Sequence, residues 1–164
     1  MRIGLGYDIH RLQEGLPLVL AGVTIDHPLG LLGHSDADVV FHALIDSILG
    51  AIGQGDIGTH FPDHDPTWEG ARGATLLSRT MDLIPPGWSI ENVDINILAQ
   101  KVRIAPHRQA MQSNLAHALQ IETDRVNIKG KTGENVGPVG REEAIEAQVV
   151  ILFQNPPPHS RNSS

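Results

Sequence analysis

The sequence contains no cysteine, and its 164 residues include only 12 Lys and Arg against 19 Asp and Glu. Without thiols the chain cannot form a disulfide scaffold, a thiolate zinc finger, an iron–sulfur centre or a cysteine nucleophile, so any metal must be bound by nitrogen and oxygen. The net charge of −7 lacks the basic surplus that supports binding to a nucleic-acid backbone. No run approaches the roughly 18 apolar residues that span a bilayer. We therefore expect a globular protein that binds neither nucleic acid nor membrane.

The length and composition are those of one compact domain. Hydrophobic residues make up 40% of the chain and charged residues 19%, close to the globular average. The opening residues contain too short an apolar stretch for a signal peptide and no Arg- and Ser-rich transit segment, so we expect a cytoplasmic protein. The proline-rich end predicts a disordered tail over residues 155–164, which leaves a single domain over residues 1–154.

The first helix is predicted over residues 36–52, where apolar side chains repeat at helical spacing. Ser35 offers an N-cap, and Asp38 at the third helical position could complete a capping box. Around this helix, strand patterns are expected at residues 2–8, 18–21, 93–99, 125–130 and 143–153, a long loop at 53–66, and further helices at 69–83 and from about 106. This order predicts an α/β (α+β) two-layer sandwich, with one mixed four-stranded sheet covered by helices and a small β-hairpin.

A metal site is suggested by three of these segments. Asp8 and His10 stand two residues apart at the end of the first strand, so both side chains point to one face. His42 lies on the first helix, with Asp38 and Asp46 four residues before and after it along one polar stripe. Two histidines and a carboxylate match a zinc site with a fourth position open for water or substrate, and the two helical aspartates could orient its rings. The alternative is a set of satisfied polar side chains, with Asp38 serving only as a cap.

Two further segments could meet a phosphate. His34 and Ser35 precede the first helix, where free backbone N–H groups favour an anion, although an ordinary cap beside an exposed histidine is the alternative. Residues 129–134 contain Gly-Lys-Thr, but Arg125 occupies the position of the glycine that a phosphate loop requires, and no helix follows. The remaining cation, hydroxyl and carboxylate of this segment fit either a phosphate with its magnesium or a plain surface turn.

Taken together, these segments resemble the 2-C-methyl-D-erythritol 2,4-cyclodiphosphate synthases of the non-mevalonate isoprenoid pathway, from Met1 to about Phe153. The resemblance rests on residues 2–10, Gly33-His34-Ser35-Asp36-Ala37-Asp38, His42-Ala43-Leu44, Asp46, Gly55-Asp56-Ile57-Gly58, Phe61-Pro62-Asp63-His64-Asp65, Ala99-Gln100, Pro106-His107, Lys129, Thr132, Glu134 and Gly140-Arg141.

The resemblance implies an enzyme that converts 4-diphosphocytidyl-2-C-methyl-D-erythritol 2-phosphate to 2-C-methyl-D-erythritol 2,4-cyclodiphosphate and CMP. The 2-phosphate would attack the β-phosphate within one molecule, a phosphorus–oxygen lyase reaction. Because the substrate carries its own nucleophile, the lack of a serine or cysteine nucleophile motif is expected. The resemblance also implies an α/β sandwich that assembles into a homotrimer with its sites between subunits.

The site residues follow from the resemblance by position. Zinc would be held by Asp8, His10 and His42, and a magnesium or manganese ion by Glu134, while His34 and Thr132 would stabilise the transition state. The methylerythritol pocket would be lined by Asp56, Ile57, Gly58, Phe61, Pro62, Asp63, His64 and Asp65. The cytidine would be cradled by Ala99, Gln100, Lys101, Val102, Arg103, Ile104 and Ala105 of a neighbouring subunit. The remaining implied contacts are Ile9, Ser35, Lys131, Gly133, Pro138 and Arg141.

The sequence departs from the family pattern in three places. Val102-Arg103 replaces a common Pro-Lys, Lys131-Thr132-Gly133-Glu134 replaces Thr-Thr-Thr-Glu, and Pro138 replaces a Phe of the central trimer cavity.

Two other classes of protein share parts of the pattern. A zinc hydrolase would use the same metal ligands with an activated water, and a non-catalytic module would bind the nucleotide without turnover.

Overall fold

The structure, a computed structural model, describes residues 1–33, 36–62, 64–68 and 70–155. The first half of the chain forms β1 (Arg2–Glu14), β2 (Leu18–Leu20), β3 (Val23–Ile25), β4 (Leu29–Leu32), α1 (Val39–Ile52), α2 (Ile57–His60) and α3 (Gly73–Met81). The second half forms β5 (Ser89–Leu98), α4 (Arg108–Leu119), β6 (Val126–Lys131), α5 (Gly137–Gly140) and β7 (Ala144–Gln154). Short 3-10 turns lie at Pro66–Trp68, Ala105–His107 and Thr123–Arg125. No helix in this described part of the chain is both long and apolar enough to cross a membrane.

The main sheet has five strands in the order β4-β1-β7-β5-β6, and β2 and β3 form a separate hairpin. Strands β5 and β6 pair in parallel, and the other pairs of the main sheet are antiparallel. The expectation of four strands is wrong because β1 continues to Glu14 instead of ending near Asp8. Its second half pairs with β4, with Arg11 opposite Leu32. The hairpin that was expected is present, with Leu18 opposite Ile25.

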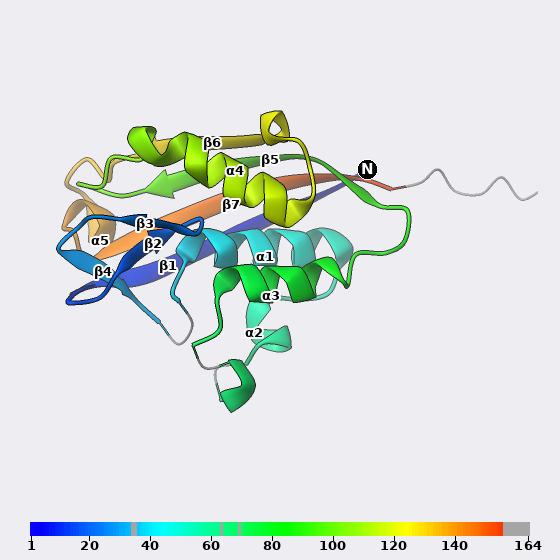
Figure 1. The fold of residues 1–164 in the computed structure, drawn as a ribbon, viewed down its shortest axis with the longest axis horizontal. Coiled ribbons are helices and arrows are strands. Elements are labelled where there is room, and N and C mark those ends of the chain that lie inside the picture. Colours follow the sequence, from blue (N-terminus) through cyan, green and yellow to red (C-terminus); the bar gives the residue numbers. More distant parts are fainter. Residues whose placement is uncertain (34–35, 63, 69, 156–164) are drawn as a thin grey trace, which may run out of the picture.

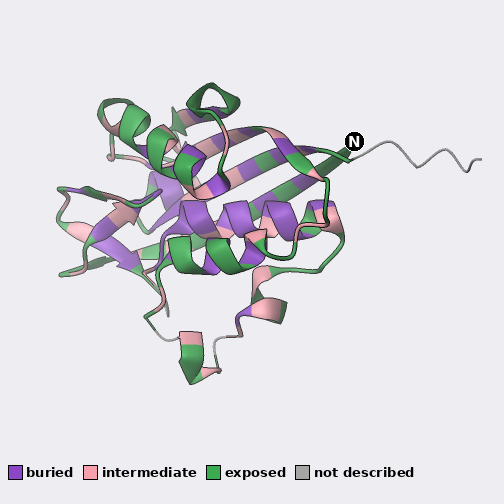
Figure 2. Ribbon diagram, turned by 45° about the vertical axis from the view of Figure 1, so that its right-hand side comes forward, coloured by how far each residue is buried: buried purple, intermediate pink, exposed green. Residues whose placement is uncertain are grey.

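The helices cover one face of the sheet and leave the other face open (Figure 1). Helix α1 packs across β1 and β7 with α3 beside it, and α4 packs near β6. Along β1 and β7 buried and exposed residues alternate, as Figure 2 shows. The side chains of β1 on the open face are apolar and exposed: Ile3, Leu5, Tyr7 and Ile9. The two-layer sandwich predicted from the sequence is therefore present, with an apolar strip left uncovered on this chain.

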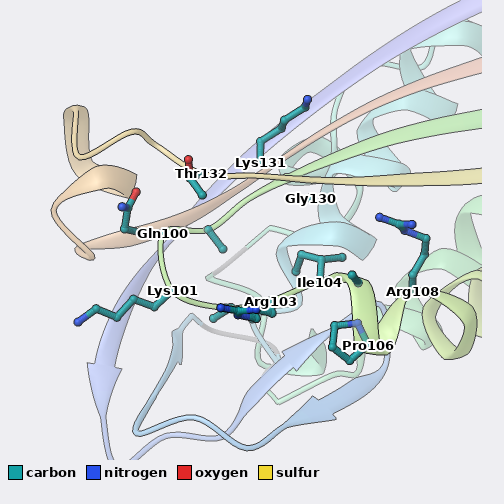
Figure 3. A pocket seen from close by; sticks show the side chains of 12 residues that line it. Gln100, Lys101, Arg103, Ile104, Pro106, Arg108, Gly130, Lys131 and Thr132 are labelled. Atoms are coloured by element: carbon teal, nitrogen blue, oxygen red, sulfur yellow. The ribbon is translucent and has the colours of Figure 1, made fainter.

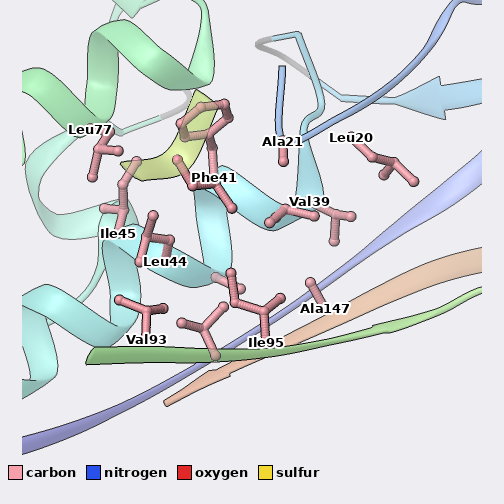
Figure 4. Close-up of a cluster of buried hydrophobic side chains, with 14 of the residues drawn as sticks. Leu20, Ala21, Val39, Phe41, Leu44, Ile45, Leu77, Val93, Ile95 and Ala147 are labelled. Carbon is pink, nitrogen blue, oxygen red and sulfur yellow. The ribbon is translucent and has the colours of Figure 1, made fainter. Parts of the chain in front are cut away.

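The core lies between α1 and the sheet. Leu44, Ile45 and Phe41 project from α1 toward Leu77 of α3 and toward the strands, whose inward side chains include Val93 (Figure 4). These residues are buried, as the helical and alternating patterns in the sequence predicted. Packing of this layer fixes α1 against β1.

Helix α1 starts later than predicted. The expected start at residue 36 is wrong, because Ala37 has φ +54° and Asp38 is extended, so neither is helical. Asp38 itself is the N-cap, and its carboxylate accepts the backbone N–H groups of Val40 and Phe41. The predicted cap, Ser35, lies outside the described residues. The helix ends at Ile52 as predicted.

The remaining elements differ from the predictions mainly at their ends. The expected loop over 53–66 contains the single turn α2, and the helix expected over 69–83 spans Gly73–Met81. The strand predicted over 93–99 begins four residues earlier at Ser89, and the last two strands lie within a residue of their expected bounds. Most of the tail, residues 156–164, lies outside the described residues.

Candidate functional site

Asp8, His10 and His42 converge at the end of α1 nearest its N-terminus. The Oδ2 atom of Asp8 lies 2.9 Å from Nε2 of His10 and 3.1 Å from Nδ1 of His42. The two ring nitrogens are 3.0 Å apart. All three side chains are partly buried, and together they form the metal-binding group that the described residues offer. The three residues selected from the spacing are therefore brought together.

Two glycines of β1 explain why His42 can reach the strand. A Cβ on Gly6 would lie 1.7 Å from the carbonyl oxygen of Ala43, and one on Gly4 would lie 1.8 Å from that of Ser47. Only residues without side chains allow the backbone of α1 to lie this close to β1. The face of β1 that carries Gly4 and Gly6 continues into Asp8, which brings its carboxylate under the first turn of the helix.

The ring of His10 has a defined orientation. Its Nδ1 lies 2.9 Å from the carbonyl oxygen of Leu32 on β4. Because a carbonyl only accepts, Nδ1–H donates. In the neutral ring Nε2 then carries the lone pair, as a metal ligand requires, and Nε2 donates to Asp8 only when the ring is protonated. A Cβ on Gly33 would lie 2.9 Å from the ring, so this glycine also makes room for it. Strand β4, which the sequence patterns missed, therefore sets the tautomer of a predicted ligand.

The electrostatics of the cluster favour a bound cation. Burial raises the pKa of Asp8, but hydrogen bonds with His10 and His42 outweigh it and hold this pKa well below its ordinary value. Burial lowers the pKa of His10, and the hydrogen bond and charge of Asp8 raise it further than burial lowers it. A tetrahedral zinc ion keeps its ligand atoms about 3.3 Å apart. Separations of 2.9–3.1 Å are close to that spacing, so the three residues fit a divalent cation without a large rearrangement.

The two aspartates four residues before and after His42 bond to backbone groups. Asp38 is fully buried and accepts the N–H groups of Ala21 and Gly22 at 2.9 and 2.7 Å, besides capping α1. Burial raises its pKa to about 6, although the backbone N–H groups act in the opposite direction. Asp46 accepts the N–H of Ile57 at 2.7 Å. Each aspartate thus attaches a loop to the helix that carries His42.

The predicted methylerythritol segment follows α1. Asp56 caps α2 by accepting the N–H and hydroxyl of Thr59, and its side chain is exposed, as is Gly58. Phe61 is buried and contacts the ring of Trp68 edge-on. Of the remaining predicted residues, Pro62 and Asp65 are half-buried, His64 is exposed, and Asp63 lies outside the described residues. His34 and Ser35, expected to meet phosphate, also lie outside them.

A cavity of about 690 Å³ lies at the edge of the sheet formed by β6, beyond the ends of β5 and β6 (Figure 3). The predicted cytidine residues 99–105 form one wall, and Gly130, Lys131 and Thr132 form another. Among the described residues that line it are four cations and no carboxylate; the cations are Lys101, Arg103, Arg108 and Lys131. In a chain with a net charge of −7, this lining favours an anionic ligand. The sequence analysis did not select Arg108, although a cation directly after Pro106-His107 could have indicated it.

Gln100 joins the two walls of the cavity. Its Oε1 accepts the N–H groups of Gly133 at 3.1 Å and Asn135 at 3.5 Å, and its Nε2 donates to Oδ1 of Asn135 at 2.9 Å. The backbone N–H of Ala99 also donates to the carbonyl of Lys131 at 2.9 Å. A Cβ on Gly130 would lie 2.9 Å from Cβ of Ile104, so this glycine lets the loop pack on the strand.

The turn after β6 brings Thr132 and Glu134 together. The hydroxyl of Thr132 donates to the Glu134 carboxylate at 2.5 Å, and Glu134 adopts φ +48°. A Cβ on Gly133 would lie 2.5 Å from the backbone nitrogen of Gly140, which explains why a threonine does not fit here. Pro138 is exposed on α5, and the exposed Arg141 makes a two-pronged ion pair with Glu143.

The cluster and the cavity are separate within one chain. None of the residues that line the cavity is a member of the cluster. Strand β7 and part of β5 lie between them in the sheet order. The side chain of Ile9, between the two ligands of β1, faces the open side of the sheet. One chain therefore holds the predicted metal ligands and the predicted cytidine residues at two separate places.

Comparison with known proteins identifies relatives over nearly the whole chain. The sequence model of the YgbB family matches residues 1–154. The chain is 53% identical over 154 residues to the 2-C-methyl-D-erythritol 2,4-cyclodiphosphate synthase of Dechloromonas aromatica (strain RCB), covering 93% of this chain and 96% of that protein.

Solved structures show the same fold. A structure titled as the CDP complex of IspF from Plasmodium falciparum superposes with a TM-score of 0.83 at 39% identity, covering 95% of this chain and 97% of that one. The bifunctional IspDF of Campylobacter jejuni gives a TM-score of 0.89 at 40% identity; the match covers 94% of this chain and 42% of that larger protein.

Proposed function

Since this chain belongs to the YgbB family, we propose that it forms 2-C-methyl-D-erythritol 2,4-cyclodiphosphate from 4-diphosphocytidyl-2-C-methyl-D-erythritol 2-phosphate, releasing CMP. The observation that carries the proposal is the cluster of Asp8, His10 and His42, with separations of 2.9–3.1 Å, in a chain 53% identical to a synthase of that name. The enzyme would be a cytoplasmic phosphorus–oxygen lyase of isoprenoid biosynthesis. Its catalytic domain would comprise residues 1–154.

The reaction needs positioning more than reactive side chains. An oxygen of the 2-phosphate forms a bond to the β-phosphorus, and the bond from that phosphorus to the oxygen bridging the α-phosphate breaks. CMP leaves with this oxygen and its electron pair, so no external nucleophile or water is consumed. Holding the attacking oxygen in line with the leaving group supplies much of the acceleration, because the reactants are parts of one folded substrate.

The residues of the chain divide this work. Asp8, His10 and His42 would hold zinc, and Glu134, beside Thr132, would hold magnesium or manganese together with the substrate phosphates. When bound, these cations neutralise charge on the phosphates as CMP departs. Thr132 would donate a hydrogen bond to the reacting phosphates, and His34, which precedes α1 in the sequence, would do the same. Residues 56–58 and 61–65 would bind the methylerythritol part.

The cavity would bind the cytidine nucleotide. Its four cations and its acid-free lining among the described residues suit a diphosphate, and a relative is titled as a complex with CDP. Gly130 lets the loop at residues 99–105 pack closely on β6, and the backbone N–H and C=O groups of this loop would read the base edge. Arg103 would contribute charge and not base selectivity.

A homotrimer with shared sites would bring the cluster and the cavity together. The open face of β1 exposes Ile3 and Leu5 at 69% and 70%, an apolar strip that a second copy of the chain can cover. The separation of cluster and cavity within one chain supports the same assembly, because the substrate must contact both. Light scattering on the active enzyme should give the mass of three chains, and a monomer mass would contradict the assembly.

The function is tested by incubating the purified protein with the authentic substrate, zinc and magnesium, and analysing products by mass spectrometry. The proposal predicts equal amounts of the cyclic diphosphate and CMP. Hydrolysis to linear phosphates would indicate a zinc hydrolase, and tight CDP binding without turnover would indicate a nucleotide-binding module. The His42→Ala variant serves as the inactive control.

A further inference from the structure

Asp46 lies between the metal cluster and the segment that follows α1. It stands four residues after His42, about one helical turn, so both side chains lie on the same side of α1. The carboxylate is half-buried, and its Oδ1 accepts the backbone N–H of Ile57 at 2.7 Å. The bond joins the helix that carries His42 to the first residue of α2.

The other side-chain hydrogen bonds of residues 54–60 stay within that segment. Asp56 accepts from Thr59, and Nε2 of His60 donates to the carbonyl of Gln54 at 2.8 Å. These bonds shape the segment but do not fix it relative to the cluster. Among side-chain hydrogen bonds of the described residues, the one from Asp46 is what attaches residues 54–60 to α1.

The charge of Asp46 makes this attachment strong. A hydrogen bond from an N–H to a carboxylate is roughly twice as strong as one between neutral groups. Burial raises the pKa of Asp46, and the charges of Asp56 and Asp8 raise it further, while the N–H of Ile57 and His42 lower it. The carboxylate is thus placed where its charge is costly, and its bond holds a segment in which only Ile57 and His60 are half-buried and the other residues of 54–60 are exposed.

We infer that Asp46 is a positioning residue, which holds residues 56–58 at a fixed distance from the cluster of Asp8, His10 and His42. This inference rests on the proposed function, in which residues 56–58 bind the methylerythritol part while the cluster lies at the phosphates. The role differs from the orientation of a histidine ring, because the oxygen of Asp46 bonds to the backbone of Ile57.

The test compares Asp46→Ala and Asp46→Asn with Gln112→Ala, a matched control. Gln112 also makes one half-buried bond to a backbone group, donating to the carbonyl of Val126 at 2.6 Å, but it lies on α4. Four quantities are measured: hydrogen exchange of residues 54–60, zinc content, the affinity for CDP, and KM and kcat with the authentic substrate.

We expect Asp46→Ala to raise the exchange rate of residues 54–60 about 10-fold and KM by a similar factor, the effect of losing one charge-assisted bond. Zinc content and CDP affinity should stay within about twofold, because neither depends on that segment, and kcat should fall less than KM rises. Asp46→Asn should show a smaller effect, since its amide oxygen can accept the same bond. Gln112→Ala should change none of the four.

Three results would overturn the inference. Loss of zinc in Asp46→Ala would show that the residue acts on His42. An equal rise of KM in Gln112→Ala would show a general loss of stability. Faster exchange in Asp46→Ala with an unchanged KM would show that the bond to Ile57 does not position the substrate. A wild-type protein that forms no cyclic product would refute the proposed function and the substrate-positioning role together. The hydrogen-exchange comparison would still decide whether Asp46 holds the segment.

Discussion

The metal cluster and the nucleotide cavity are built in different ways. The cluster uses one strand and one helix brought into contact by Gly4 and Gly6, and its three ligand atoms already lie within about 3 Å of one another. The cavity uses a loop and the end of β6, held by Gln100 and lined by exposed cations. The three ligand atoms of the cluster are thus preorganised within one chain, whereas the cavity is open. Under the proposed function, the cluster is the metal half of the active site, and the cavity is the nucleotide half, which a neighbouring chain would complete.

The largest effect is expected from His42→Ala, which removes a ligand of the metal half and leaves the nucleotide half unchanged. The variant should lose its zinc, and activity should fall about 1000-fold or more because a ligand and its charge are removed. The cavity shares no residue with the cluster, so CDP affinity should stay within about twofold. Elemental analysis and calorimetry check both parts. Full zinc content in the variant would show that the ligands are wrongly assigned.

The next effect concerns the contact that preorganises the metal half. Gly6→Ala would place a Cβ 1.7 Å from a carbonyl oxygen of α1, so the helix must move, and unfolding free energy should drop by more than about 3 kcal/mol. Gly137→Ala is the matched change near the nucleotide half. Its Cβ meets nothing within 4 Å, and the φ of +67° alone should cost about 1 kcal/mol. Urea unfolding measures the free energy of unfolding of both variants. Equal losses would show that the close contact at Gly6 is no more important for stability than the open position at Gly137.

A pH measurement separates the two interpretations of Asp38. Its pKa is raised by burial to about 6 in the folded protein, above the ordinary value of 3.8, so the folded state binds the proton more tightly. Folding stability should therefore decrease as pH rises from about 4 to about 6, by about 2 kcal/mol, and then level off.

Asp38→Asn should lack this decrease and should keep its zinc, since the carboxylate caps α1 and binds Ala21 and Gly22. Urea unfolding of both proteins across that pH range measures the difference. Loss of zinc from Asp38→Asn would instead favour a role in orienting a ligand.

The smallest effect is expected in the nucleotide half. Arg103→Gln should weaken CDP and UDP about 10-fold each, because charge acts on the phosphates of both, and should leave a clear preference for CDP. Lys101→Gln should weaken both only about twofold, since Lys101 already pairs with Glu142 at 2.9 Å. Calorimetry with magnesium gives the affinities. Comparable wild-type affinities for CDP and UDP would refute a cytidine pocket.

The contrast between the cluster and the cavity also explains which parts of the structure the sequence could predict. Asp8, His10 and His42 were found because strand and helix periods place them on known faces. The sequence patterns missed β4, and with it the full length of β1, because β4 has only four residues and they do not alternate. One of them is Gly30, where a Cβ would lie 2.2 Å from the carbonyl oxygen of Leu16. The late start of α1 was missed because nothing in the pattern signals the positive φ of an alanine.

The periodicity of the sequence predicted few of the contacts in the nucleotide half. The bonds of Gln100 to Gly133 and Asn135 link residues more than 30 positions apart, and no local pattern predicts such pairs. The residues of that half were proposed from the family resemblance. Asp46 was selected for its place beside His42, while its bond to Ile57 depends on how the segment after α1 folds back.

The central claim is that one active site combines the metal half of one chain with the nucleotide half of another. It is tested most directly by mixing His42→Ala with the double variant Thr132→Ala, Glu134→Ala, each inactive alone, under conditions that let trimers exchange subunits. At equal amounts, a shared site should restore about one quarter of wild-type activity, because each half is intact with a chance of one in two. Activity that stays at the level of the separate variants, in trimers shown to be mixed, would contradict the claim.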